Sequence, residues 1–582
     1  MPNDPSFDLT REQWLPVRRR DGGADKLSLR DVFAQAHELR RLVGDVPTQE
    51  FALLRLLLAI LHDAVDGPRE IEDWQELWDK GLPADRVTDY LDEHRERFDL
   101  LHPRQPFFQT AGLSAMSGEV GSLDRLVADV PNGRPFFTMR ARGVDRLGFD
   151  EAARWLVHAH AFDTSGIKTG VKGDDRVKGG KAYPLGVAWA GTLGGVLAEG
   201  DTLAETLLLN LVAFDTPNLR IDPRRDLPTW RRDPVEPGQA KPGELSTRPA
   251  GVRDLYTWQS RRVRLAFDAD GVHGVVLTYG DPLAPHNMHA HEPMTGWRRS
   301  PAQEKKLSLA QVYLPREHDP ARSVWRGLGA LIAGRAEGGE QRSEAAAVVR
   351  PRILDWVARL TVESDMPTDF LIRARLFGVV YGTQQSVIDE IVDDAVAMRV
   401  ILLKENDRRL GQTAIDAVSD AEKAVTVLGD LAADLARASG ADAEAPKAAA
   451  RDLGFATLDG PFRDWLAALG SEGASADPRA LWQDEARRCV GRLGGELVGS
   501  AGAEAWQGRV ETWKGKQVWL NASLADLLFR ARLRKALPGT GRPRRDSPDG
   551  DPPGDDLPDI GSPDDVEDGG FENGGGPPDT EK

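Results

Sequence analysis

Residues 49–65 read QEFALLRLLLAILHDAV, and this run locates the core of the chain. Its apolar residues recur at helical spacing, and the Thr48 hydroxyl can cap the helix. The most apolar part, Phe51–Leu61, is too short to cross a bilayer and is interrupted by Arg55. We therefore expect a buried core helix here, preceded by a second helical pattern from Leu27 to Leu42.

The chain that follows combines long loops with a predicted β-hairpin. Apolar and polar residues alternate over Arg262–Phe267 and Val272–Tyr279, on either side of an Asp-Ala-Asp-Gly turn. Loops rich in proline, glycine and arginine separate this hairpin from the helices that precede it. The pattern predicts an α+β body with long loops.

Helical spacing dominates the chain beyond Thr383. A seam of apolar residues steps by alternating fours and threes from Ala414 to Leu435, as in packed helices. Further helical patterns follow over Leu481–Val498 and Val518–Leu537. We also expect a helix face that carries Ile388, Ile391, Val392 and Ala395.

The fold class is therefore α+β, with three predicted parts. A large N-terminal mixed domain with long loops and β-hairpins occupies residues 1–380, and a C-terminal antiparallel four-helix bundle occupies residues 381–538. Residues 539–582 form an acidic Pro/Gly tail, in which 15 of the last 37 residues are glycine or proline, and we expect it to be disordered.

Charge and composition exclude several classes of protein. The net charge of the 582 residues is −17, but 13 acids and one base after Arg545 account for −12, so the acidity does not argue against a nucleic-acid partner. The single cysteine, Cys489, permits no intrachain disulfide and no Cys-rich zinc site. The first 20 residues lack the apolar run of a signal peptide, so we expect a cytoplasmic protein.

Signatures of catalysis are weak. Gly180-Lys181 lacks both the first glycine and the hydroxyl of a phosphate loop. One alternative remains open, a metal-dependent hydrolase or nuclease that uses the His286–His291 cluster beside Glu292. We expect a chain without catalytic residues, metal or cofactor.

Three basic stretches point instead to nucleic acid: Arg134–Arg146, Lys168–Lys181 and Arg220–Arg264. Any one of them alone is more typical of a solvated loop, but three in one domain favour a binding surface. A bare interaction scaffold without nucleic-acid contact is the remaining hypothesis.

Several short motifs occur in a fixed order along the chain. They are Phe7-Asp8-Leu9-Thr10, Trp14-Leu15-Pro16-Val17, the Pro47–Leu58 helix, His102-Pro103 with Pro106-Phe107-Phe108-Gln109, Gly179-Gly180-Lys181, Leu227-Pro228-Thr229-Trp230 and Tyr256-Thr257-Trp258-Gln259. In this order they resemble a known family, the CasA large subunits of the type I-E CRISPR Cascade complex. The resemblance extends to about Leu537.

This resemblance implies a non-catalytic, RNA-guided DNA-binding subunit for antiviral defence. It would recognise the protospacer-adjacent motif (PAM) of foreign double-stranded DNA through the minor groove, help to initiate the R-loop, stabilise the displaced strand and recruit a helicase-nuclease. Its implied partners are the other Cascade subunits, the guide RNA and target DNA. No membrane partner is implied.

The resemblance also implies site residues. The family's glycine-rich loop corresponds to 163–170, with Thr164, Ser165, Gly166 and Lys168 as DNA contacts. The family's glutamine wedge corresponds to Gln385, flanked by Gln384; the alternative is a capping turn before a helix at Val387.

Two further family contacts have expected counterparts. No lysine lies between Lys241 and Lys305, so Asn287, His286 or His289 would replace the family's lysine. The loop that contacts RNA and the backbone subunits would use Arg134, Phe136, Phe137, Arg140 and Arg142.

Overall fold

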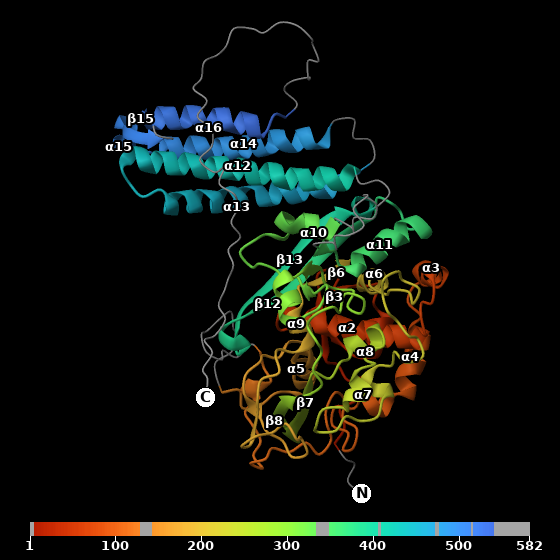
Figure 1. Ribbon diagram of the computed structural model, residues 1–582. Coiled ribbons are helices and arrows are strands. Elements are labelled where there is room, and N and C mark those ends of the chain that lie inside the picture. The colour runs from red at the N-terminus through yellow and green to blue at the C-terminus, as the bar shows by residue number, and fades with distance from the viewer. Residues whose placement is uncertain are drawn as a thin grey trace. The chain divides into compact units, whose positions relative to one another are not determined.

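The computed structural model describes residues 5–128, 143–332, 348–404, 409–471, 477–513 and 516–539. The chain divides into two compact units, Met1–Val418 with Asp459–Pro478, and Ser419–Leu458 with Arg479–Lys582. The fold is α+β, with small antiparallel sheets and a C-terminal helical region (Figure 1). Within the described ranges, no helix has the length and apolar character needed to span a membrane.

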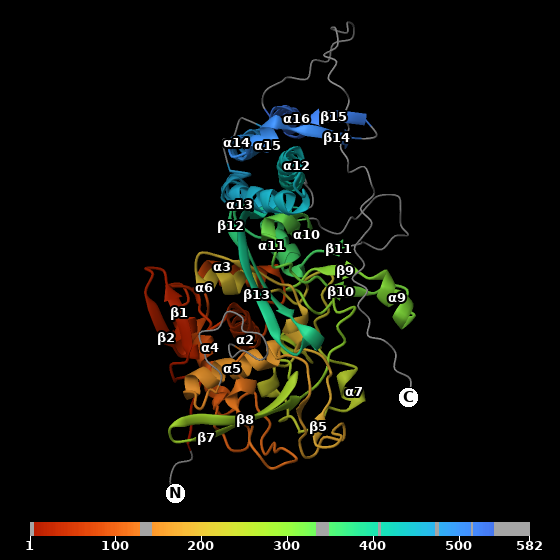
Figure 2. The same ribbon diagram turned by 90° about the vertical axis from the view of Figure 1, so that its left-hand side faces the viewer.

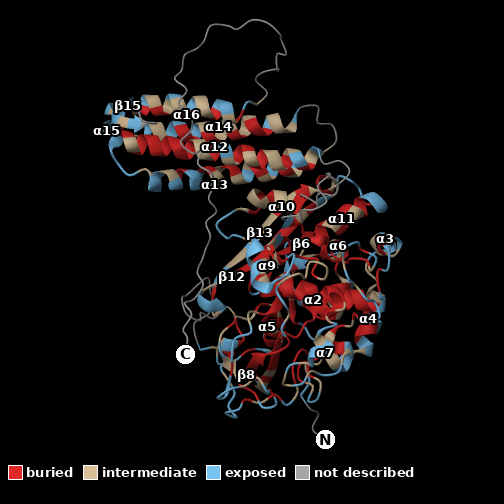
Figure 3. Ribbon diagram, viewed as in Figure 1, coloured by how far each residue is buried: buried red, intermediate tan, exposed pale blue. Residues whose placement is uncertain are grey.

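Helix α2 (Pro47–Val65) confirms the predicted core helix of the first unit. Seventeen of its 19 residues are buried, as Figure 3 shows along its length. The predicted cap is wrong: the helix begins at Pro47, whose missing N–H costs nothing there, and the Thr48 hydroxyl bonds His158 Nε2 at 2.9 Å. Helices α4 (Ala84–Glu93), α5 (Phe149–Phe162) and α8 (Val252–Tyr256) contact α2.

The helical pattern predicted over Leu27–Leu42 is correct only in its middle. In the sequence, helix α1 (Leu29–Ala34) lies between strands β2 (Ala24–Leu27) and β3 (Leu39–Leu42). The two strands flank β1 (Leu15–Arg19) in a three-stranded sheet. Leu27 pairs with Leu15 and Leu42 pairs with Val17. Pairing with β1 therefore decides the conformation of residues that local spacing assigned to a helix.

The predicted helix over Ile388–Ala395 is wrong. These residues belong to strand β13 (Ile388–Arg399), which pairs along its length with β12 (Leu371–Tyr381) in the long ribbon of Figure 2. Strand β6 (Gly195–Glu199) completes the sheet on the other side of β12. Strand pairing again outweighs the apolar spacing. Alternate residues of β13 exchange N–H and C=O hydrogen bonds with β12, as in any antiparallel pair. Residues 382–387 form the tip of this ribbon.

The one predicted β-hairpin is confirmed. Strands β7 (Arg261–Asp268) and β8 (Gly271–Tyr279) pair as a hairpin that places Arg261 directly opposite Tyr279.

The remaining strands and α-helices of the first unit have at most twelve residues each. The strands are β4 (Lys168–Thr169), β5 (Lys181–Ala182), β9 (Trp297–Arg299), β10 (Tyr313–Pro315) and β11 (Val348–Val349). The helices are α3 (Ile71–Lys80), α6 (Leu203–Leu209), α7 (Pro242–Leu245), α9 (Pro301–Leu307), α10 (Leu328–Ile332) and α11 (Arg352–Glu363).

Helix α12 (Arg409–Ser439) carries the predicted apolar seam, with Ala421, Val425 and Leu428 fully buried. In the second unit it forms ion pairs with three other helices: Asp430 with Lys447 at 3.5 Å, Asp420 with Arg479 at 2.8 Å and Asp434 with Arg532 at 3.5 Å. These partners lie on α13 (Glu444–Ala468), α14 (Pro478–Gly499) and α16 (Ala522–Ala536).

The last predicted helix begins later than expected. Val518 lies in strand β15 (Lys516–Leu520), which pairs with β14 (Arg509–Trp513) after the short helix α15 (Ala503–Gln507). The Asn521 side chain then caps α16 by accepting from the Leu524 N–H.

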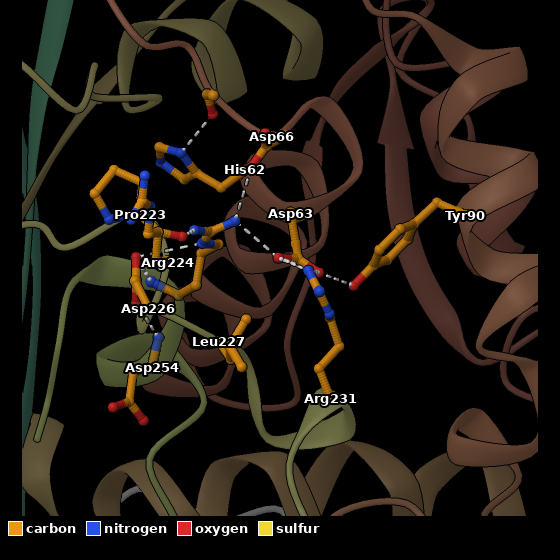
Figure 4. Close-up of polar contacts among 12 residues, drawn as sticks. His62, Asp63, Asp66, Tyr90, Pro223, Arg224, Asp226, Leu227, Arg231 and Asp254 are labelled. Atoms are coloured by element: carbon orange, nitrogen blue, oxygen red, sulfur yellow. Dashed lines mark hydrogen bonds and ion pairs between the residues drawn. The ribbon is translucent and has the colours of Figure 1, made fainter.

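A buried network of charges joins the end of α2 to distant loops (Figure 4). The Asp63 carboxylate accepts hydrogen bonds from Tyr90 Oη at 2.6 Å, Arg231 Nη1 at 3.0 Å and Arg253 Nη1 at 2.8 Å. Arg253 also pairs with Asp226, and burial raises the pKa of Asp226 to about 6. Asp63 and Asp226 are fully buried as side chains, so the segment that contains Arg231 and Arg253 is fastened to the core.

We expect Asp63→Asn to destabilise the first unit by about 3–5 kcal/mol, because it leaves the buried Arg253 without its charged partner at α2. Urea unfolding of the full chain followed by tryptophan fluorescence measures the loss. Asp89→Asn, an exposed aspartate on α4, is the matched control and should change the free energy of unfolding by less than about 0.5 kcal/mol. Equal effects of the two substitutions would contradict the role given to Asp63.

Candidate nucleic-acid interface

Two segments far apart in the sequence meet in the first unit. One is the glycine loop, residues 163–168, which follows α5, and the other is the tip of the β12–β13 ribbon. The Ser165 N–H donates to the Gln385 carbonyl at 2.8 Å. Gly166 has a φ of 108°, and a Cβ there would lie 3.5 Å from Ser386 Cβ. A side chain at position 166 would therefore be strained as well as close to the tip. The structure thus brings together the glycine loop and the glutamine pair expected from the sequence.

A buried cluster of charges holds the glycine loop from beneath. The Asp163 carboxylate pairs with Lys168 Nζ at 2.6 Å and accepts a hydrogen bond from Arg261 Nε. The Arg261 guanidinium also donates to the carbonyls of Asp163 and Thr164. We call Asp163, Lys168, Arg261 and Tyr279 the pedestal.

Tyr279 completes the pedestal. Its hydroxyl donates to the Gly166 carbonyl at 2.6 Å, while the Arg261 guanidinium and the Lys168 ammonium lie 4.9 and 5.4 Å from its ring centroid. The loop carbonyls of residues 163, 164 and 166 therefore all face inward and have donors. Because these groups are satisfied, the loop conformation is fixed before any ligand arrives.

The pedestal holds two cations and one carboxylate, and their charges shift one another's pKa values. Burial alone would raise the pKa of Asp163, but the charges of Lys168 and Arg261 outweigh it and hold that pKa below its usual value. Burial lowers the pKa of Lys168, against the opposing effect of Asp163. The Lys168 side chain is only 9% exposed. Lys168 therefore positions the loop through Asp163 and does not present a free cation to solvent.

The other expected loop contacts differ in accessibility. Ser165 is buried, and Thr164 and Gly166 are partly buried. Asp163 lies inside the expected loop 163–170, but neither it nor Arg261 and Tyr279 is among the contact residues that the resemblance implies. No local pattern marks them, because Arg261 and Tyr279 lie about a hundred residues from the loop and meet it only through the hairpin.

The ribbon tip presents Gln384 and Gln385 to solvent. Both residues have a φ of 55°, in the left-handed region that residues other than glycine seldom adopt. The tip is closed by the Gly382 N–H, which donates to the Val387 carbonyl, and by the Ser386 hydroxyl, which donates to the Thr383 carbonyl. The alternative of a capping turn before a helix is wrong, because a strand follows.

The Asn287 side chain is hydrogen-bonded to a neighbouring loop and strand. Its side chain accepts from the Tyr313 N–H at 2.8 Å and donates to the Gln311 carbonyl at 3.0 Å, which fastens its loop to β10. Among the contacts of the described residues, none joins Asn287 to the glycine loop or to the ribbon tip. The expected RNA-contact residues Arg134, Phe136, Phe137, Arg140 and Arg142 lie outside the described residues.

The His286–His291 segment does not assemble a metal centre. Across the described ranges, no three His, Cys, Asp or Glu side chains are arranged to hold a metal ion. Glu292, the carboxylate beside the histidines, is fully buried and bonded to Arg55 at 2.9 and 3.0 Å and to Trp189 Nε1 at 2.9 Å. The acid on which the hydrolase alternative depended is therefore part of the core.

The basic stretch Arg220–Arg264 proves to be largely structural. Six of its arginines pair with acidic side chains, and the side chains of Arg253, Arg261 and Arg262 are at most 3% exposed. The interpretation of this stretch as one continuous basic surface is wrong for the buried Arg253, Arg261 and Arg262, whereas Arg231 is 40% exposed. The pairs are Arg231–Asp63, Arg253–Asp63, Arg232–Asp254, Arg248–Asp254, Arg261–Asp163 and Arg262–Asp281.

The stretch Lys168–Lys181 retains exposed charge. Lys172, Lys178 and Lys181 are exposed, and Lys181 lies opposite Thr169 in the β4–β5 pair. The Thr169 hydroxyl accepts from Arg125 Nη1 at 2.5 Å. A hollow of about 440 Å³ is lined by Arg125, by the glycine loop and by Ser386 and Val387 of the ribbon tip. The site therefore combines exposed amides, exposed cations and a concave surface.

Comparison with known proteins shows one consistent match. The family of CRISPR-associated protein Cse1 matches residues 8–493. The crystal structure of Thermobifida fusca Cse1 superposes with a TM-score of 0.85 and 65% identity over 92% of this chain and 99% of that one. CRISPR-associated protein CasA/Cse1 of Thermus thermophilus is 32% identical over 330 residues, which cover 56% of this chain and 60% of that relative. A chain of a CRISPR RNA-guided surveillance complex shares the fold, with a TM-score of 0.65 at 20% identity over 91% of this chain and 99% of that one.

We expect Asp163→Asn to loosen the glycine loop, because Lys168 and Arg261 then share a buried site without a carboxylate. The free energy of unfolding should fall by about 3–5 kcal/mol, and amide exchange at Ser165 should accelerate. Hydrogen exchange and urea unfolding measure the two effects.

Asp175→Asn, an exposed aspartate in the same basic loop, is the matched control. Adding Lys168→Met to Asp163→Asn should recover part of the loss, because it removes one of the two unpaired cations. No recovery in the double variant would contradict the role given to Asp163 as the shared partner of Lys168 and Arg261 in the pedestal.

Proposed function

The chain belongs to the CRISPR-associated Cse1 family, also named CasA, and from this membership we propose that it is the large subunit of a type I-E Cascade surveillance complex. The family match over residues 8–493 and the 65% identity to a solved Cse1 support the assignment. The fold is also that of a chain in an RNA-guided surveillance complex. In this role the subunit binds DNA and RNA and performs no catalysis.

The glycine loop is the proposed reader of the PAM. Its backbone is held by the pedestal, and Thr164 and Gly166 are its partly exposed members. The minor groove offers few distinguishing hydrogen-bond groups, so a loop of backbone and small side chains accepts several motifs. Recognition of foreign duplex DNA through the minor groove is then tolerant of motif sequence.

The exposed pair Gln384 and Gln385 is the proposed wedge that starts strand separation. A planar amide can replace the hydrogen bonds of a broken base pair and stack on the exposed step. The single observation that carries this proposal is the bond from the Ser165 N–H to the Gln385 carbonyl, which sets the wedge directly beside the reading loop. Formation of the R-loop is nearly isoenergetic, so such modest contacts decide whether it begins.

The remaining parts have proposed partners. Residues 1–380 bind the PAM, and the loop that contains Arg134, Phe136, Phe137, Arg140 and Arg142 contacts the guide RNA and the backbone subunits. Apart from the wedge at Gln384 and Gln385, residues 381–538 act with the small subunits to stabilise the displaced strand, with α12, α13, α14 and α16 as a four-helix bundle. The complex then recruits a helicase-nuclease, which supplies the catalysis.

Reconstitution tests the proposed function as a whole. We expect that a guide-RNA complex from the same organism that lacks its large subunit binds target duplex tightly only after this chain is added. Binding should also depend on the trinucleotide that flanks the target, as measured by mobility shift with that trinucleotide varied. If the chain neither joins the complex nor changes its DNA binding, the proposed function is wrong.

The wedge has its own test. We expect Gln385→Ala to weaken binding of fully paired target about tenfold or more, whereas binding of a target already open beside the motif should change less than about threefold, because the wedge acts only while strands must part. Gln412→Ala, at an exposed residue of α12, is the matched control. Equal losses on both targets would exclude Gln385 as the wedge.

A further inference from the structure

Ile167 projects from the glycine loop, and the functions proposed above do not use it. The residue is 59% exposed, the largest exposed fraction among the large apolar residues in the described parts of the chain. Burying an isoleucine stabilises a protein by roughly 1.5–3 kcal/mol, so an exposed one stays in water at a cost. Exposure alone does not indicate a partner, since Val362 is 56% exposed, but an isoleucine inside a proposed binding loop is placed where the ligand can cover it.

The exposure of Ile167 is imposed by its neighbours. The Gly166 carbonyl on one side accepts from Tyr279 Oη, and the Lys168 side chain on the other side pairs with Asp163. Lys168 also pairs with Ala182 across the β4–β5 strands. The backbone on both sides of Ile167 is therefore anchored, and little further order is lost when a ligand covers the side chain.

The surroundings of Ile167 favour duplex DNA as the covering partner. The exposed glutamine pair is tethered two residues away through the Ser165 amide, and Ile167 lines the hollow shared by the loop and the tip. The exposed Lys178 and Lys181 belong to the same β4–β5 hairpin and complement phosphates. An apolar side chain flanked by amides and cations matches proteins that press Ile, Leu or Phe against base steps from the minor groove.

We infer that Ile167 contacts the minor-groove edge of the base step beside the PAM and loosens its stacking before the glutamine wedge enters. This inference rests on the proposed function and adds a residue that acts by shape. An isoleucine reads no hydrogen-bond pattern, so its contribution depends on how easily the step unstacks. Flexible pyrimidine–purine steps at this position are favoured over stiff A-tract steps.

The test uses the complete reconstituted complex and a target duplex with 2-aminopurine at the base pair beside the PAM, whose fluorescence rises on unstacking. We expect Ile167→Ala to weaken binding of the closed duplex about tenfold, or about 1.4 kcal/mol, and to reduce the fluorescence rise. Ile167→Leu should restore both to within about twofold, because it keeps the apolar volume. Val362→Ala, an equally exposed β-branched residue on α11, is the matched control and should change neither.

Two results would overturn the inference while the proposed function survives. In the first, the unaltered complex binds in a PAM-dependent manner and Ile167→Ala matches it in affinity and fluorescence. In the second, Ile167→Ala lowers incorporation of the chain into the complex, measured by size-exclusion chromatography, which would mean that another subunit covers Ile167. Loss of PAM dependence in the unaltered complex would instead refute the proposed function and the inference together.

Discussion

The candidate site depends on one buried interaction, the pairing of the Asp163 carboxylate with Arg261 and Lys168. Asp163 ends helix α5, Lys168 begins β4, and Arg261 begins β7, so one carboxylate sets the positions of three elements. The Tyr279 ring beneath the two cations and its hydroxyl bond to Gly166 extend this control to the loop itself. Without the carboxylate, two buried cations would repel each other beneath the loop.

A second buried carboxylate, that of Asp63, also anchors distant segments of the first unit. Asp63 receives Arg231 and Arg253 from a long proline-rich segment that has little regular structure of its own. Arginine suits this use because its planar guanidinium donates to several acceptors at once and stays charged when buried. Some arginines of the basic stretch Arg220–Arg264, which the sequence suggests as a nucleic-acid surface, therefore hold loops in place through buried ion pairs.

Membership of the Cse1 family and the geometry of the glycine loop and the ribbon tip both support the proposed function. In the proposed function the glycine loop and the exposed glutamine pair contact a duplex and start its opening, and hydrogen bonds hold the backbone of both segments before DNA binds. Lys168, although it lies in the loop, is committed to the pedestal, so the cations available to phosphates are those of the adjacent hairpin, such as Lys178 and Lys181.

The sequence by itself determined the core helix, the β7–β8 hairpin, the apolar seam of α12 and the family, because strong local periodicity and ordered short motifs survive without knowledge of the fold. It misassigned Ile388–Ala395 and parts of Leu27–Leu42, where pairing with distant strands overrides local spacing. Only the tertiary structure decided which cations are free, since Arg261 meets Asp163 from 98 positions away. Charge is a property of each residue, but its availability depends on partners that only folding brings near.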